Sequence, residues 1–218
     1  MNTANEILND ISTALQGGKA KLINELVNKA LADGITAKDI LEQGLLPAMD
    51  IIAEKFMNNE VYVPEVLIAA RAMNVGSEIL KPHLAESGVK PIGKALLGTV
   101  KGDLHDIGKN LVRMMFEGKG IEVIDLGVDV SPEQFVAAYQ KEKTDIIALS
   151  ALLTTTMNEM KNTVAAFTAA GIREKVTIMV GGAPVTDSFR ADIGADIYTS
   201  DAASAAEAAK KAILAQKS

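Results

Sequence analysis

Asp103 and His105 lie in the polar segment GTVKGDLHDIGKN, residues 98–110, and His105 is one of two histidines in the chain. Because residues two apart in an extended segment point the same way, we expect the Asp103 carboxylate beside the His105 imidazole. A carboxylate that accepts a hydrogen bond from one ring nitrogen makes the other nitrogen a better metal ligand. Gly108, at the start of the next predicted helix, would let a bulky group approach the backbone. The pattern indicates a metal-ligating imidazole, but a loop histidine without that role fits so short a motif as well.

Two later segments carry groups that suit the binding of a ligand. The segment SALLTTTM begins at Ser150 and supplies further hydroxyl groups at residues 154–156. An ordinary cluster of helix N-cap residues explains these hydroxyls equally well. The segment VGGAPVT contains Gly181 and Gly182, which permit close backbone approach, although a tight turn needs the same residues.

The residue pattern in the second half of the chain predicts strands and helices that would bring these segments together. Short β-rich runs alternate there with amphipathic stretches of helical periodicity. The runs are Ala95 to Val100, Ile121 to Leu126, Ile146 to Leu149, Val176 to Val180 and Asp196 to Tyr198. Near-continuous apolar strands separated by helices are typical of a parallel sheet covered on both faces, so we predict a five-stranded, flavodoxin-like (Rossmann-type) α/β domain over residues 93–218. Such sheets bind ligands beyond the carboxyl ends of their strands, where all three segments fall.

The first half of the chain shows helical periodicity and no strand pattern. The first helix carries apolar residues at Ile7, Leu8, Ile11 and Leu15. Gly17-Gly18 and Asp33-Gly34 break the first two helices, Thr36 suits the N-cap of a third, and Pro64 suits the first turn of a fourth. Residues 1–88 are therefore predicted to form an all-α four-helix bundle.

A segment rich in Gly, Ser and Pro, ESGVKPIG at Glu86 to Gly93, marks the boundary between the two predicted domains. Within the bundle, a cluster of Met and aromatic residues is expected to lie in the core. Its members are Met49, Phe56, Met57 and Tyr62. His83, near the end of the fourth helix, is expected at the surface without a role in binding.

Composition excludes several classes of protein. Twenty-eight Asp and Glu against 22 Lys and Arg give a net charge of −6, the wrong sign for a protein that binds a phosphate backbone. The absence of cysteine removes disulfides, thiolate nucleophiles, iron–sulfur clusters and cysteine-ligated zinc, which fits a cytoplasmic protein. The polar opening MNTANEILND and the lack of an apolar run of about 18 residues favour neither export nor membrane insertion. We therefore expect a cytoplasmic protein with no nucleic acid or membrane partner.

Three catalytic or nucleotide-binding motifs are rejected on spacing. The stretch from Gly102 to Asn110 differs from a P-loop because five residues separate the glycines and Asn110 replaces the required Ser or Thr. Ser150 lacks the G-x-S-x-G elbow of a hydrolase nucleophile. The G-x-G-x-x-G fingerprint of dinucleotide-binding domains does not occur.

The motifs together resemble the cobalamin-binding domain of corrinoid proteins and methionine synthases. Each motif follows a predicted strand, and they read Asp103-x-His105-x-x-Gly108, Ser150-x-Leu152 and Gly181-Gly182. The segment from Met49 to Leu84 is similar to the helical cap domain that precedes this module. The size and the two-domain organisation resemble the free-standing corrinoid subunit of methylamine, methanol or related methyltransferase systems.

The resemblance implies a role for three side chains at the lower face of the cofactor. In that family the cofactor's own base leaves the cobalt and a protein histidine replaces it, which corresponds to His105 in the motif. Asp103 would orient this ligand, and a hydroxyl group would complete the relay. Thr156 stands at the hydroxyl position, where relatives carry serine. The resemblance thus implies base-off/His-on binding of cobalamin.

The resemblance also assigns the rest of the binding surface. Leu104 and Asp106 would touch the corrin ring, and Ala202 would contact the nucleotide tail. The tail would enter a slot lined by Gly108, Ser150, Leu152, Thr154, Gly181 and Gly182. In the cap domain of the family, an aromatic residue near the position of Tyr62 shields the upper face of the cobalt.

The function implied by the resemblance is that of a methyl carrier in methylotrophic metabolism. Cobalt(I) would take a methyl group from a substrate-specific methyltransferase, and methyl-cobalt(III) would deliver it to a second methyltransferase that uses tetrahydrofolate or coenzyme M. A reductive activase would rescue oxidised cobalt. The chain itself would be a non-catalytic subunit of this multi-component system. A cobalamin-binding sensor or the cofactor subunit of a cobalamin-dependent mutase is the alternative.

Overall fold

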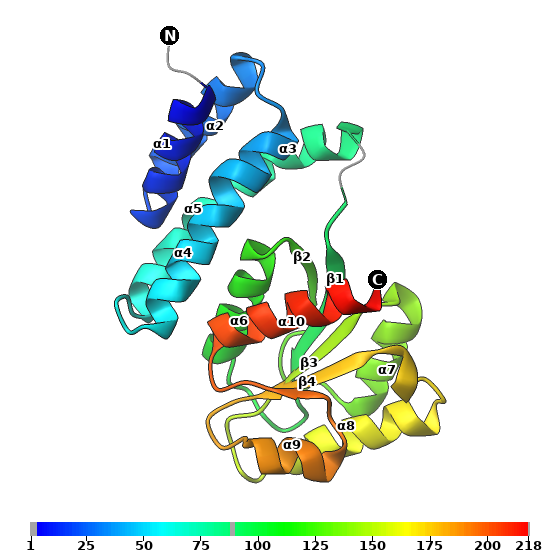
Figure 1. The fold of residues 1–218 in the computed structure, drawn as a ribbon. Coiled ribbons are helices and arrows are strands. Elements are labelled where there is room, and N and C mark those ends of the chain that lie inside the picture. Colours follow the sequence, from blue (N-terminus) through cyan, green and yellow to red (C-terminus); the bar gives the residue numbers. More distant parts are fainter. Residues whose placement is uncertain (1–3, 88–89, 218) are drawn as a thin grey trace. The chain divides into compact units, whose positions relative to one another are not determined.

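The computed structural model describes residues 4–87 and 90–217, and the chain divides into two compact units, Met1–Pro91 and Ile92–Ser218 (Figure 1). Residues 88–89 of the predicted boundary segment lie outside the described residues. Each unit has its own secondary structure: the first contains helices, and the second alternates strands with helices. Among the described residues, no helix is both long and apolar enough to span a membrane.

The first unit is helical, as the sequence predicts. Its elements are α1 (Ala4–Gln16), α2 (Ala20–Ala32), α3 (Ala37–Asp39), the π-helical turn η1 (Ile40–Leu45), α4 (Leu46–Met57) and α5 (Val63–Ser87). The predicted third helix is thus a composite in which α3, η1 and α4 follow one another directly. Thr36 is its N-cap, because its Oγ1 accepts a hydrogen bond from the N–H of Asp39 at 3.0 Å. Pro64 lies in the first turn of α5, and Gly18 and Gly34 adopt left-handed conformations after α1 and α2.

The core of the first unit contains the predicted apolar face of α1. Ile7, Leu8, Ile11 and Leu15 are all buried. Met49 is buried as well, whereas the prediction of a core position is wrong for Met57 and Tyr62, whose exposed fractions are 41% and 64%. Met57 ends α4 and Tyr62 precedes α5, so both lie at the turn between the two helices, where helical periodicity no longer determines which face a residue occupies.

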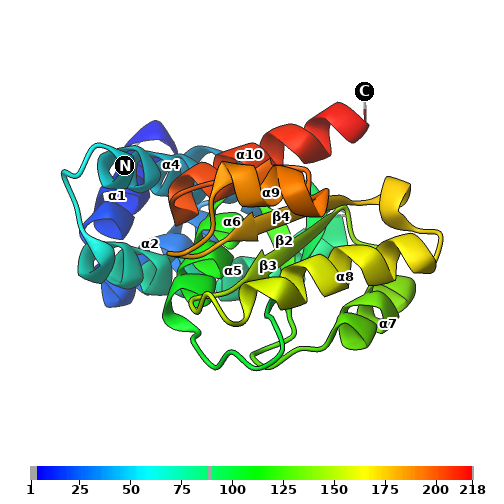
Figure 2. The same cartoon turned by 90° about the horizontal axis from the view of Figure 1, so that it is seen from below.

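The second unit is a five-stranded parallel sheet with helices on both faces, which confirms the predicted α/β fold (Figure 2). The strands are β1 (Gly93–Thr99), β2 (Ile121–Asp125), β3 (Ile146–Ser150), β4 (Thr177–Gly181) and β5 (Ile197–Tyr198). The helices are α6 (Ile107–Gly118), α7 (Pro132–Glu142), α8 (Met157–Ala169), the short 3-10 turn η2 (Arg173–Lys175), α9 (Asp187–Ile193) and α10 (Ala202–Gln216). Helices α6 and α10 pack together on one face, and α7 packs beside α8 on the other.

The strand order β2-β1-β3-β4-β5 determines where the site lies. The order reverses between β1 and β3, so the loops that follow these two strands diverge to opposite faces of the sheet. In the register, Thr99 pairs with Ser150 and Ser150 pairs with Gly181, so β1, β3 and β4 end at the same level. The core beneath this edge is closely packed, and a side chain at Gly98 would place its Cβ 2.7 Å from the ring of Phe135.

Candidate cofactor site

The candidate site begins with a tight turn at the carboxyl end of β1. The N–H of Asp103 donates to the carbonyl oxygen of Val100 at 3.1 Å, which closes a β-turn over residues 100–103. Gly102, the third residue of this turn, has a φ of +79°, a conformation that glycine adopts without strain. The hydroxyl of Thr99 donates to the carbonyl oxygen of His105 at 2.8 Å. Helix α6 then starts at Ile107. The turn and the Thr99 hydrogen bond fix the main chain around Asp103 and His105.

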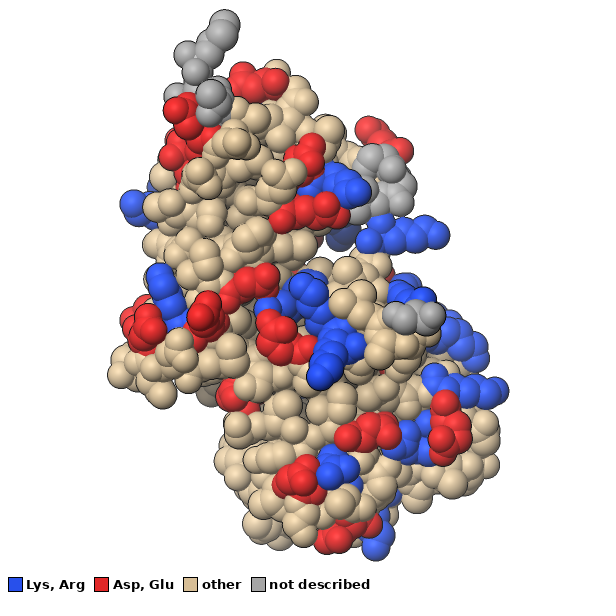
Figure 3. Space-filling model, in the orientation of Figure 1, with Lys and Arg blue, Asp and Glu red and all other residues tan. Residues whose placement is uncertain are grey.

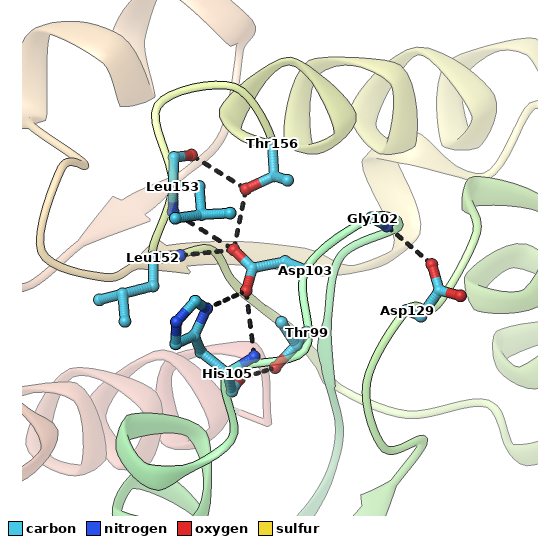
Figure 4. Close-up of polar contacts among 8 residues, drawn as sticks. All are labelled: Thr99, Gly102, Asp103, His105, Asp129, Leu152, Leu153 and Thr156. Atoms are coloured by element: carbon cyan, nitrogen blue, oxygen red, sulfur yellow. Dashed lines mark hydrogen bonds and ion pairs between the residues drawn. The ribbon is translucent and has the colours of Figure 1, made fainter.

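The Asp103 carboxylate and the His105 imidazole lie side by side, as the sequence predicts (Figure 4). Oδ1 of Asp103 lies 2.7 Å from Nδ1 of His105 and also accepts the His105 N–H at 3.1 Å. Asp103 is fully buried, whereas 51% of the His105 side chain is exposed. The carboxylate therefore anchors the inner edge of a ring whose other edge is accessible.

The second carboxylate oxygen of Asp103 is bound by the segment that follows β3. It accepts hydrogen bonds from the N–H groups of Leu152 at 2.8 Å and Leu153 at 3.3 Å, and from the hydroxyl of Thr156 at 2.8 Å (Figure 4). Thr156 occupies the N-cap position of α8, yet its side chain caps no helix N–H. For Thr156, the simple N-cap explanation is therefore wrong, because the hydroxyl contacts the buried carboxylate instead.

The charge state of Asp103 follows from these contacts. Burial alone would raise its pKa, but the hydrogen bonds from Leu152, His105 and Thr156 outweigh burial and hold the pKa of this carboxyl well below its usual range. An ionised carboxylate only accepts hydrogen bonds, so Nδ1 of His105 must carry the proton. In a neutral imidazole this tautomer leaves the lone pair on Nε2, the atom that a metal would bind.

The surroundings of His105 are apolar and exposed. Leu104 and Ile107 are 72% and 75% exposed, and Leu152 and Leu153 are also exposed. Apolar side chains at the surface on either side of an imidazole suit a flat, largely apolar macrocycle better than a hydrated ion. Among residues 4–87 and 90–217, no three His, Asp or Glu side chains come together as a metal site. With its exposed edge, the His105 ring could offer one nitrogen to a metal held within such a macrocycle.

The glycines at this edge have different structural roles. A side chain at Gly108 would meet no atom within 4 Å, so the fold itself leaves open space there. At Gly182, φ is +130° and a Cβ would lie 1.9 Å from the carbonyl oxygen of Ala151. The fold alone therefore requires glycine at position 182, because the main chain of Ala151 leaves no room for a Cβ, whereas it does not require glycine at position 108.

The remaining predicted site residues follow the carboxyl edge of the sheet without joining the Asp103 hydrogen-bond network. Ser150 and Gly181 are half-buried at the ends of β3 and β4, and Ala202 is buried at the start of α10. Two more, Asp106 and Thr154, are exposed in the loops after β1 and β3.

Sequence reasoning missed three contributors to the site. Thr99 and Leu153 contact His105 and Asp103 as described above, and Asp129 contacts the turn from the loop after β2. A polar residue at the end of an apolar strand was the available signal for Thr99. Leu153 contributes only its main chain, which leaves no signal in the sequence.

Comparison with protein families identifies both units. Residues 93–210 match a family model described as the B12 binding domain, and residues 7–81 match a second model with the same description. The trimethylamine corrinoid protein of Methanosarcina barkeri is 38% identical over 215 residues, which cover 98% of this chain and 99% of the relative. A corrinoid protein of Desulfitobacterium hafniense is 37% identical over 208 residues, covering 94% and 96%.

Solved structures agree with these matches. The methanol:cobalamin methyltransferase complex MtaBC from Methanosarcina barkeri contains a chain with a TM-score of 0.86 and 31% identity, covering 96% of this chain and 80% of that chain. A cobalamin-binding protein from Desulfitobacterium hafniense gives a TM-score of 0.78 at 31% identity, covering 94% and 98%. Because one family model spans more than half of the chain and relatives match it over nearly their full length, the chain belongs to the B12-binding domain family as a corrinoid protein, with cobalamin as its cofactor.

Proposed function

We propose that this protein is a methyl carrier that binds cobalamin in the base-off/His-on form, with Nε2 of His105 as the lower ligand of the cobalt. The observation that carries the proposal is the buried, ionised Asp103 carboxylate 2.7 Å from Nδ1 of His105, whose ring is half exposed beside apolar side chains. This arrangement fixes the tautomer that a metal ligand needs before any cofactor arrives.

The residues of the chain divide the work of binding. His105 supplies the ligand nitrogen. Asp103 orients the ring, because its carboxylate accepts a hydrogen bond from the proton on Nδ1. The N–H of Leu152 and the hydroxyl of Thr156 help to keep Asp103 ionised, since they donate to its second oxygen. When bound, cobalamin supplies a cobalt centre that accepts a methyl group from one donor and releases it to an acceptor.

The proposed binding surface extends from His105 along the carboxyl edge of the sheet. Leu104 and Asp106, both exposed, would contact the corrin ring. The nucleotide tail would lie against the ends of β3, β4 and β5. The residues proposed to line its path are Gly108, Ser150, Leu152, Thr154, Gly181, Gly182 and Ala202. We assign the tail-binding role to residues 93–218 and the role of helical cap to residues 1–88.

The proposed partners follow from the relatives. The chain matches trimethylamine and dimethylamine corrinoid proteins, and its fold matches a chain of a methanol:cobalamin methyltransferase complex. We propose a substrate-specific methyltransferase as methyl donor, a second methyltransferase that uses tetrahydrofolate or coenzyme M as acceptor, and a reductive activase, all in the cytoplasm. Full-length matches to corrinoid proteins favour a carrier over a sensor or a mutase subunit.

Methyl transfer in a reconstituted system tests the proposal. The full-length protein, loaded with cobalamin and reduced, is mixed with purified methylamine and methanol methyltransferases and their methyl donors. We expect stoichiometric methylation of the bound cofactor with one donor system. Methylation of the His105→Ala protein should be much slower. Cobalamin binding without methyl transfer from any such enzyme, combined with activity that requires adenosylcobalamin or light, would favour the mutase or sensor alternative.

A further inference from the structure

The turn that carries Asp103 is held from its far side by Asp129, in the loop between β2 and α7. Oδ1 of Asp129 accepts the N–H of Gly102 at 2.7 Å, and the N–H of Asp129 donates to the carbonyl oxygen of Asp103 at 3.0 Å. In Figure 4, Asp129 lies across the turn from His105 and Thr156. The side chain of Asp103 is thus bound by the segment after β3, and its main chain by Asp129.

Asp129 adopts an unusual backbone conformation to make these contacts. Its φ is +54°, in the left-handed region, which Asp and Asn tolerate better than most residues other than glycine. The loop is itself aligned with the end of β1, because Thr99 donates its N–H to Gly127 and accepts the N–H of Val130, both at 3.0 Å. The Asp129 side chain is exposed, so packing of the core does not explain why it is held there.

We propose that Asp129 is a positioning residue for the lower ligand: it holds the Gly102–Asp103 main chain so that the Asp103 carboxylate presents His105 in one orientation. The inference rests on the proposed role of His105. Without the Asp129 acceptor, the N–H of Gly102 loses its partner and the turn gains freedom. The carboxylate remains bound by Leu152 and Thr156, so the expected consequence is a weaker ligand rather than an unfolded protein.

Two substitutions at this position separate the acceptor from the backbone conformation. Asp129→Gly keeps the left-handed conformation and removes the acceptor, whereas Asp129→Asn keeps both a side-chain oxygen and tolerance of that conformation. Loss of a group that hydrogen-bonds directly to a metal ligand costs about 10- to 100-fold in affinity, and Asp129 acts one step further away, through Asp103, so the lower end of this range applies. We therefore expect Asp129→Gly to lower the ratio of His-bound to His-free cobalamin about tenfold, and Asp129→Asn to restore it to within about threefold.

The ratio is measured from the visible spectrum of the cobalamin-loaded protein. A second readout uses the cobalamin-free protein: the ¹⁵N chemical shifts of the His105 ring and the exchange rate of the Gly102 amide. In Asp129→Gly, the Gly102 amide should exchange faster and the ring nitrogens should shift towards a tautomeric mixture. In Asp129→Asn, both signals should stay near those of the unaltered protein.

Two control variants test the two effects separately elsewhere in the second unit: one replaces a left-handed residue with glycine, and the other removes a carboxylate that accepts a main-chain hydrogen bond. Lys143→Gly replaces another left-handed residue, with a φ of +52°, after α7. Asp145→Ala removes a carboxylate that accepts the N–H of Lys94 at 2.8 Å, at the opposite end of β1. Asp145→Ala should lower the free energy of unfolding, whereas Lys143→Gly should leave it unchanged or raise it, because glycine suits a left-handed position after a helix. Both controls should leave the His105 signals unchanged.

The proposal is wrong if Asp129→Gly leaves the ratio and the ring shifts unchanged, or if either control alters them as strongly. His105→Ala, measured in parallel, separates this inference from the proposed function. If His105→Ala does not change the spectrum, the ligand assignment fails, and the ring shifts of the cobalamin-free Asp129→Gly protein still decide whether Asp129 orients His105.

Discussion

The side chain of Lys109, four residues after His105 in the chain, forms a largely buried ion pair with Asp125. Nζ of Lys109 lies 2.6 and 2.5 Å from the two carboxylate oxygens of Asp125, and the lysine side chain is only 2% exposed. Lys109 belongs to the first turn of α6 and Asp125 ends β2, so the pair fixes the start of the helix that follows His105 against the edge of the sheet.

Lys109→Met should therefore destabilise the cobalamin-free protein by about 2 to 4 kcal/mol, because it leaves Asp125 without its cation in a largely buried site. Urea unfolding measures the change. Lys94→Met is the matched control, since the ion pair of Lys94 with Glu122 is exposed and its loss should cost less than about 1 kcal/mol. Equal effects of the two substitutions would show that the buried pair has no special role in the fold.

Thr156→Val should weaken the anchoring of Asp103 while it preserves the shape of the side chain. The variant removes the hydroxyl that donates to the buried carboxylate at 2.8 Å, and hydrogen bonds to charged groups contribute about 1.5 to 3 kcal/mol. Thr156→Ser keeps the donor and should lose less than half as much. Unfolding free energies of both variants check this, and a serine variant as unstable as the valine variant would contradict the role of the hydroxyl.

The stability of the protein should depend on Asp103 in a defined pH window. The folded-state pKa of Asp103 lies below its unfolded value of about 4, so the group stabilises the fold above that pH, and the contribution is lost as the pH falls towards the folded pKa. Asp103→Asn should therefore be less stable than the unaltered protein at pH 7, and the difference should shrink below about pH 4. Chemical unfolding of both proteins between pH 7 and pH 3 measures it; a difference that stays constant or widens at low pH would count against an ionised, buried carboxylate.

Gly108 and Gly182 should respond to alanine in opposite ways. Gly182→Ala should destabilise the protein by more than about 3 kcal/mol, since its Cβ would meet the Ala151 carbonyl oxygen in a conformation that alanine rarely adopts. Gly108→Ala has open space and lies in the first turn of α6, so the free energy of unfolding should stay the same or rise by up to about 1 kcal/mol. Thermal unfolding distinguishes the two.

Gly108→Ala also tests the proposed tail path, because its methyl group would occupy open space that the proposal assigns to the nucleotide tail. We expect a weaker affinity for cobalamin in a fully folded protein. Unchanged affinity, measured by equilibrium dialysis, would remove Gly108 from the binding surface.

The sequence was most informative where side chains report their own surroundings. Near-continuous apolar runs such as Ile146 to Leu149 predicted parallel strands, because both faces of such strands are buried. The spacing of Asp103 and His105 predicts their contact, because side chains two residues apart in an extended segment point in the same direction. Both predictions depend on local geometry.

Other features depend on contacts between distant segments, which the sequence does not encode locally. The N–H groups of Leu152 and Leu153 bind Asp103 only because β1 and β3 end at the same level in the sheet. The ion pair between Lys109 and Asp125 joins the start of α6 to the end of β2, and the spacing of the two residues in the sequence does not predict it. The prediction of a core position is wrong for Tyr62, because helical periodicity describes the face of a helix and not the turn at its end.

The most direct test of the central claim is the visible spectrum of the methylated, cobalamin-loaded protein with and without the His105 side chain. The account predicts that the unaltered protein shows a nitrogen-ligated cobalt, that His105→Ala shows the form without a lower nitrogen, and that added imidazole restores the first spectrum in the variant. Identical spectra for the two proteins, with cobalamin bound equally in both, would contradict His105 as the ligand.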